Sequence, residues 1–301
     1  MLALFFLKMN IKETYMKNYK KLLIIPIIIF AISLIIIFQH YSSTGEIVDK
    51  DVTLKGGLTI TIYSPIDIPD LKAQLKLEFP KGDIIVRRLT EFGSNEQIGL
   101  LIEAAEVEEE ELKAVLEEKL NLELTKDNYS VEQVGSSLGN AFYKQMRTAL
   151  ILAFIFMAIV ILITFRAWIP AFTIVFCAFA DMVFVVAIMN LFGMRLSTTG
   201  IAALLMLIGY SIDTDIVITT KALKRKEEGN IVDRMTSGVK TGLTMTISTV
   251  VALTVGYFVS QSYVIKEMFL IIILGLIFDV IMTYLFNTGV LVWWTRRKAK
   301  Y

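Results

Sequence analysis

Six long apolar stretches, separated by polar or charged residues, dominate the chain. They cover Leu22–Phe38, Thr148–Phe165, Pro170–Phe192, Leu196–Thr220, Val239–Val259 and Met268–Trp293. A bilayer core roughly 30 Å thick needs about 20 apolar residues at about 1.5 Å rise per residue. The pattern therefore predicts six transmembrane helices, the first at residues 22–38 and the other five forming a bundle over residues 148–293.

Between the first two spans, residues 39–147 have the pattern of a small α+β domain. Strands are predicted at Leu58–Tyr63, Asp83–Arg88, Gln97–Glu103 and Tyr129–Val134, and helices at Asp70–Phe79 and Glu108–Leu122. The order β-α-β-β-α-β matches the ferredoxin-like split βαβ pattern. The predicted fold class is thus a membrane α-helical bundle with a small ferredoxin-like α+β domain.

The distribution of Lys and Arg predicts the orientation in the membrane. Basic residues gather in the N-terminal tail (1–21), between the fourth and fifth spans, and in the C-terminal tail (294–301), whereas the short loops on the other side carry only Arg195 and Lys266. Short cytoplasmic loops are enriched in such residues. We therefore expect a multi-pass protein of the cell membrane with both termini cytoplasmic and residues 39–147 extracytoplasmic. The basic segment 221–236 is expected to lie on anionic lipid.

Composition excludes several classes of function. Residues of hydrophobic type make up 55% of the chain, and the formal net charge of +1 argues against a nucleic-acid partner. One cysteine, Cys177, and one histidine, His40, leave no intramolecular disulfide and no His/Cys metal site or Ser–His nucleophile. We expect no cofactor, no metal and no enzymatic chemistry.

Two acidic residues of the fourth span are candidates for proton coupling. Asp213 and Asp215 are two positions apart, about 200° around a helix, so they cannot share one face. Asp213 is the favoured residue, ahead of Asp215, with Lys240 at the start of the fifth span as a possible cation partner. The alternative is that Asp213 is a static hydrogen-bonded group near the helix end.

Two further acids lie near the middle of their spans, Asp181 in the third and Asp279 in the sixth. A charge in hydrocarbon is costly and needs a partner, a wet cavity or a proton. These residues either continue a polar relay or bond to Ser and Thr on neighbouring helices, and we favour the second interpretation. The hydroxyl-rich stretch Thr241–Thr249 indicates tight packing of the fifth span against the fourth.

Several motifs resemble the SecD/SecF family, within the resistance–nodulation–division group of proton-driven membrane proteins. The residues that carry the resemblance are Gly56 and Gly57 at the start of the outer domain, Gly209, Tyr210 and Ser211 in the fourth span, and Val239-Lys240-Thr241 in the fifth. The family plan of one span, a large outer domain and five more spans covers the whole chain. In a gap-free alignment Asp213 coincides with the SecD aspartate, while the aspartate of bacterial members of the other branch falls on Thr214.

The resemblance implies a role in protein export. Such a chain would act with SecD, the Sec translocon channel and unfolded exported polypeptides, using the proton gradient to promote translocation. One alternative is a homo-oligomeric proton-driven transporter of small molecules or lipid from the same superfamily. Another is a structural scaffold that stabilises the translocon.

Overall fold

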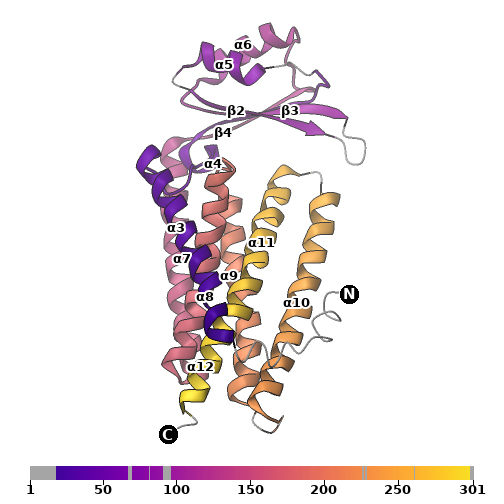
Figure 1. Ribbon diagram of the computed structural model, residues 1–301. Helices are drawn as coiled ribbons and strands as arrows, with labels where there is room; N and C mark the ends of the chain where they lie inside the picture. Colours follow the sequence, from indigo (N-terminus) through magenta and orange to yellow (C-terminus); the bar gives the residue numbers. More distant parts are fainter. Residues whose placement is uncertain are drawn as a thin grey trace.

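The molecule consists of a helical bundle with an α+β unit at one end (Figure 1). A computed structural model describes residues 18–66, 70–80, 82–90, 96–225, 227, 229–260 and 262–298. Most of the predicted N-terminal tail (1–17) and the last three residues of the predicted C-terminal tail lie outside the described residues.

Among the described residues, six helices are long and apolar enough to cross a membrane, as the sequence predicts. The first five are α3 (Ile24–Thr44), α7 (Ser136–Phe165), α8 (Trp168–Leu191), α9 (Thr198–Leu223) and α10 (Ile231–Val259). The sixth begins as α11 (Tyr263–Ile281), continues through the π-helix η2 (Met282–Asn287) and ends as α12 (Thr288–Lys298). The chain is a mostly helical membrane protein with several passes.

Helices α8, α9 and α11 form the centre of the bundle. Their buried side chains include Ile174, Leu207 and Ile271, each 0% exposed. Helices α3, α7 and α10 lie outside them and leave large apolar side chains such as Phe38 and Phe156 exposed. In a membrane these outward apolar faces meet lipid, so the side chains that pack inside the bundle are the ones that fix its geometry.

The α+β unit is a four-stranded antiparallel sheet with two helices on one face (Figure 1). The strands, in the order β2-β3-β1-β4, are β2 (Asp83–Thr90), β3 (Gln97–Ala105), β1 (Gly57–Ile62) and β4 (Tyr129–Val134). The helices are α5 (Leu71–Glu78) and α6 (Glu109–Leu120). Every second residue of β1 (Leu58, Ile60 and Ile62) is buried among leucines of both helices, because strand side chains alternate between faces.

A short helix, α4 (Val52–Lys55), connects the unit to the bundle. Asp51 caps it by accepting a hydrogen bond from the Thr53 amide at 2.7 Å. The residues before α4 run beside those before α9: the Leu196 amide donates to the Asp49 carbonyl at 2.7 Å, and the Asp51 amide donates to the Leu196 carbonyl at 3.1 Å. This pairing between distant segments, which nothing in the sequence predicts, holds the sheet over the ends of α9 and α11.

Candidate functional site

Three aspartates from three central helices meet inside the bundle. Asp181 comes from α8, Asp215 from α9 and Asp279 from α11, and each is 0% exposed. An ionised carboxylate in such surroundings is unfavourable unless hydrogen bonds or a proton compensate it. The hydrogen bonds of these three side chains therefore define what the cluster can do.

Asp215 accepts two of these hydrogen bonds. The Asn287 side-chain amide donates to its Oδ1 at 2.7 Å, and the Thr283 hydroxyl donates to the same oxygen at 2.8 Å. Asp181 accepts from the Ser211 hydroxyl at 2.6 Å, through its Oδ2. Asp181 thus has a serine partner on a neighbouring helix, which is compatible with either interpretation of its role.

One hydroxyl lies between two of the carboxyls. Thr283 Oγ1 is 2.8 Å from Asp215 Oδ1 and 3.0 Å from Asp279 Oδ1. A threonine hydroxyl has a single proton and can donate to only one of them. Both contacts are hydrogen bonds only when one carboxyl carries a proton and donates it to Oγ1. The geometry is therefore suited to a cluster that shares protons.

The second oxygens of the carboxyls leave room for further protons. Asp181 Oδ1, Asp215 Oδ2 and Asp279 Oδ2 are buried without a hydrogen-bond partner among the described residues. Asp279 also lies close enough to Asp181 for the charges of the two carboxyls to interact. Two neighbouring carboxyls repel when both are ionised and attract when they share a proton.

The π-helix η2 orients the donors. It begins just after Asp279 and carries both Thr283 and Asn287 toward α9. Single π-turns inside α-helices widen the helix locally and occur frequently at functional sites. The sequence pattern predicts a role for Asp279 but not for Thr283 and Asn287, whose signal in the sequence is their four-residue spacing from Asp279 in an apolar span.

The structure separates the other predicted residues from this cluster. Asp213 is exposed, on a different face of α9 from the buried Asp215, as their spacing requires. Lys240 is exposed on α10. Other cations bridge α9 and α10: the Lys221 ammonium donates at 2.9 Å to both the Ser237 and Thr241 hydroxyls, and the Arg234 guanidinium donates to the Ala222 carbonyl at 2.8 Å.

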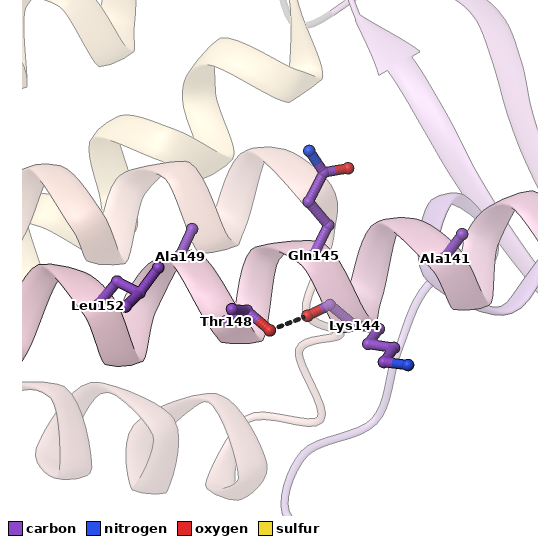
Figure 2. A pocket seen from close by; sticks show the side chains of 6 residues that line it. All are labelled: Ala141, Lys144, Gln145, Thr148, Ala149 and Leu152. Atoms are coloured by element: carbon purple, nitrogen blue, oxygen red, sulfur yellow. Dashed lines mark hydrogen bonds between the residues drawn. The ribbon is translucent and has the colours of Figure 1, made fainter.

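A shallow hollow on α7 is a less suitable site. It is lined by Ala141, Lys144, Gln145, Thr148, Ala149 and Leu152, all from one exposed helix face (Figure 2). Its dashed hydrogen bond joins the Thr148 hydroxyl to the Lys144 carbonyl at 2.9 Å, within the helix itself. No acid lines the hollow. Among the described residues no group of His, Cys, Asp and Glu is arranged to hold a metal ion.

Comparison with known proteins identifies the family. The family described as "Protein export membrane protein SecD/SecF, C-terminal" matches residues 114–297. The protein-export membrane protein SecF of Pyrococcus furiosus is 35% identical over 285 residues, covering 95% of this chain and 94% of that protein. SecF of Methanocaldococcus jannaschii is 33% identical, covering 94% and 99%. The chain belongs to the SecF family. It is a SecF-like protein-export subunit.

The solved structures agree on the fold of this SecF-family chain. SecDF from Thermus thermophilus, described as a translocon-associated membrane protein, superposes with a TM-score of 0.74 at 16% identity. The match covers 94% of this chain and 38% of that one, so the chain spans about two-fifths of SecDF. A SecDF structure in its super-membrane-facing form gives a TM-score of 0.62.

The residues that carry the SecD/SecF resemblance have distinct places in the structure. Ser211 is fully buried and hydrogen-bonded to Asp181, and Tyr210 packs against the main core. Gly209 is exposed, and a β-carbon added to it would meet nothing within 4 Å. Gly56 and Gly57 have positive φ angles of 88° and 147°. A β-carbon on Gly56 would lie 2.4 Å from Ser136 Cα, so glycine is required where α4 meets α7.

Proposed function

We propose that this SecF-like subunit uses the proton gradient to promote export, and that it binds protons at Asp215, Asp181 and Asp279. The observation that supports the assignment is the Thr283 hydroxyl within 3.0 Å of both Asp215 and Asp279. The proposal moves the proton-coupling role from Asp213, which is exposed in this chain, to the buried Asp215.

The cluster would couple protons to helix movement. When protonated, the carboxyls attract one another through shared hydrogen bonds; when ionised, buried like charges at this range repel strongly. Each carboxyl stands on a different central helix, so a change in charge alters the preferred separation of α8, α9 and α11. Water or a shift of the helices must then compensate the charge.

SecD is the proposed partner, with the Sec channel and unfolded polypeptide as the machinery and substrate. Six spans with one outer unit make half of a pseudo-symmetric arrangement, and this chain covers 38% of SecDF.

We further propose that both termini are cytoplasmic and that the α+β unit is extracytoplasmic. The strand order β2-β3-β1-β4 supports a ferredoxin-like assignment of that unit.

A matched pair of variants tests the site. The chain, purified from its native membrane with any co-purifying partner, is reconstituted into vesicles, and gradient-dependent export is measured. Asp215→Asn keeps the shape but cannot ionise, so gradient-dependent export is expected to fall to the level without a gradient. Asp213→Asn makes the same change two residues away, at an exposed position, and should retain it.

Two outcomes would contradict the proposal. Full gradient-dependent export by Asp215→Asn excludes this residue, and loss confined to Asp213→Asn returns the role to the exposed aspartate. The same purification tests the partner: recovery of a SecD chain supports the heteromer, whereas recovery of this chain with itself alone supports the homo-oligomeric transporter.

A further inference from the structure

A second group of charged residues lies where the α+β unit meets the bundle. Its members are Asp51, Lys55, Asp83, Arg87, Glu103, Arg195 and Glu267, which we call the joint. They come from the sheet, from α4 and its N-cap, from the segment before α9, and from α11. Asp51, Glu103 and Glu267 are buried, with exposed fractions of 8%, 4% and 6%.

Most members of the joint are paired. Arg87 forms an ion pair with Glu103, Arg195 with Asp83, and Lys55 lies 3.6 Å from Asp83. Arg87 also stacks over the ring of Tyr263, at 4.3 Å from its centroid, one helical turn before Glu267. The sheet is therefore attached to the start of α11 through one guanidinium.

Glu267 has a different environment. Its hydrogen bond comes from the Ser197 hydroxyl at 2.9 Å, and Ser197 in turn caps α9 by accepting from the Gly200 amide at 2.8 Å. Among the described residues it has no cation within ion-pair distance. The charged groups that act on it are Asp51 and Glu103, both acidic, and Arg87, which Glu103 already holds.

The joint contains one more acidic side chain than basic side chains. Four acids (Asp51, Asp83, Glu103 and Glu267) face three bases (Lys55, Arg87 and Arg195). Burial raises the pKa of both Asp51 and Glu103 above their ordinary values, and the Asp51 charge raises that of Glu103 further. The joint is thus electrically balanced with one proton bound, and an added negative charge is unfavourable there.

We propose that Glu267 is a second proton-binding residue of this chain, on the side of the α+β unit, and that its charge determines how firmly that unit is held on the bundle. When Glu267 is neutral the joint has equal numbers of positive and negative charges. When it is ionised, it repels Asp51 and Glu103 and competes with Glu103 for Arg87. The contact between sheet and bundle is then weakened.

The position of Glu267 relates the joint to the proposed proton site. Glu267 and Asp279 lie on the same helix, 12 residues and about 18 Å apart. Between them are buried apolar side chains, including Leu204, Leu207 and Ile271. The two acidic layers are thus separated by buried apolar side chains. The inference extends the proposed proton coupling, but the binding of a proton at Glu267 stands on the joint alone.

The test measures the distance between sheet and bundle in the full chain. Spin labels are attached at Ser130→Cys in β4 and Ser262→Cys before α11, both exposed, while the native Cys177 is fully buried. Distance distributions are recorded in lipid nanodiscs from about pH 8 to about pH 5, a range in which buried carboxyls can titrate. We expect the population with the shorter label distance to rise as pH falls.

The variants determine whether Glu267 is responsible. Glu267→Gln, which resembles the protonated form, should show the low-pH distribution at every pH, and Glu267→Asp should keep the response. Glu118→Gln is the matched control, since it removes an exposed carboxyl of α6 and should titrate like the unsubstituted chain. A pH-independent distance in the unsubstituted chain, or an unchanged response in Glu267→Gln, would overturn the proposal.

This measurement needs no proton gradient and no export. Asp215→Asn should therefore keep the pH response of the labels even though it loses gradient-dependent export. If export depends on Asp215 but the labels do not respond to pH, only the role of Glu267 fails. If the labels respond but export is indifferent to Asp215, only the proposed role of the buried cluster fails.

Discussion

The side-chain amide of Asn287 donates a hydrogen bond of 2.7 Å to Asp215, a residue 72 positions earlier in the chain. The bond joins the π-helix η2 to α9 in the middle of the bundle. Asn287 and Thr283 together supply the hydrogen-bond donors that offset the free-energy cost of burying the Asp215 carboxylate. These two donors are therefore as important to the proposed site as the acids.

Removing the donors should impair the site without changing its acids. For Asn287→Ala combined with Thr283→Val, we expect gradient-dependent export to fall about tenfold or more, since a hydrogen bond to a charged group contributes about 1.5–3 kcal/mol. The control is Thr244→Val, which removes an exposed hydroxyl on α10 that donates to the Lys240 carbonyl within the same helix. Equal rates for both variants would show that Asp215 does not depend on these donors.

Because α4 lies so close to α7, we expect alanine substitution to change stability very differently at two nearby glycines. Gly56 has φ 88° and no room for a β-carbon, whereas Gly135 has φ −64° and nothing within 4 Å. Gly56→Ala should lower the free energy of unfolding by about 2–4 kcal/mol, from backbone strain and overpacking. Gly135→Ala should leave thermal stability in detergent nearly unchanged. Similar melting temperatures for the two variants would contradict the role given to Gly56.

The ion pairs of Asp83 predict a dependence of stability on pH. Burial alone raises the pKa of Asp83, but the hydrogen bond and charge of Arg195, with Lys55, outweigh burial and lower it below the ordinary value of 3.8. A lowered folded-state pKa gives stability that is present above the unfolded value and lost as pH falls through the folded value. Asp83 is partly exposed, so the contribution is about 0.2–1 kcal/mol.

Asp83→Asn should therefore melt at a lower temperature than the unsubstituted chain near neutral pH. The two melting temperatures should converge as pH falls below about 4, where the unfolded carboxyl is protonated. A difference that persists or grows in acid would mean that the substitution acts through packing instead of through charge. Thermal unfolding in detergent, measured at several pH values, distinguishes these cases.

The single cysteine reports whether the buried cluster is dry. Cys177 is 0% exposed and lies near Asp215. A thiol reagent should react with it at least about a hundredfold more slowly than with Ser130→Cys, because the reagent reaches it only through opening of the bundle. Denaturation in detergent should abolish the difference. Rapid labelling of Cys177 in the native protein would show that water reaches the cluster in the resting state.

The sequence alone was sufficient to predict the long apolar helices and the strands and helices of the α+β unit. A run of about 20 apolar residues has few alternatives to crossing a bilayer, because lipid offers no hydrogen bonds to an unpaired backbone. Alternating residues such as Leu58, Ile60 and Ile62 likewise have one stable arrangement, with the apolar side against α5 and α6. These features depend on neighbours in sequence.

Helical spacing also separated Asp213 from Asp215, but it did not show which of them faces inward. That choice depends on the rotation of α9 against α8 and α11, which is set by packing between residues far apart in the chain. The favoured residue, Asp213, is exposed, and Asp215 lies with Asp181 and Asp279. The experiment with Asn at each position decides between their roles.

Composition and periodicity determined that this protein has six helices long and apolar enough to cross a membrane, together with an α+β unit, because local apolar pattern controls how each segment meets lipid, water or its neighbours. Only the tertiary structure decided which polar groups meet. The contacts of Asn287 with Asp215 and of Glu267 with Ser197 join residues about 70 positions apart. Such pairs depend on helix rotation and on the position of the π-helix, which no local pattern of residues specifies.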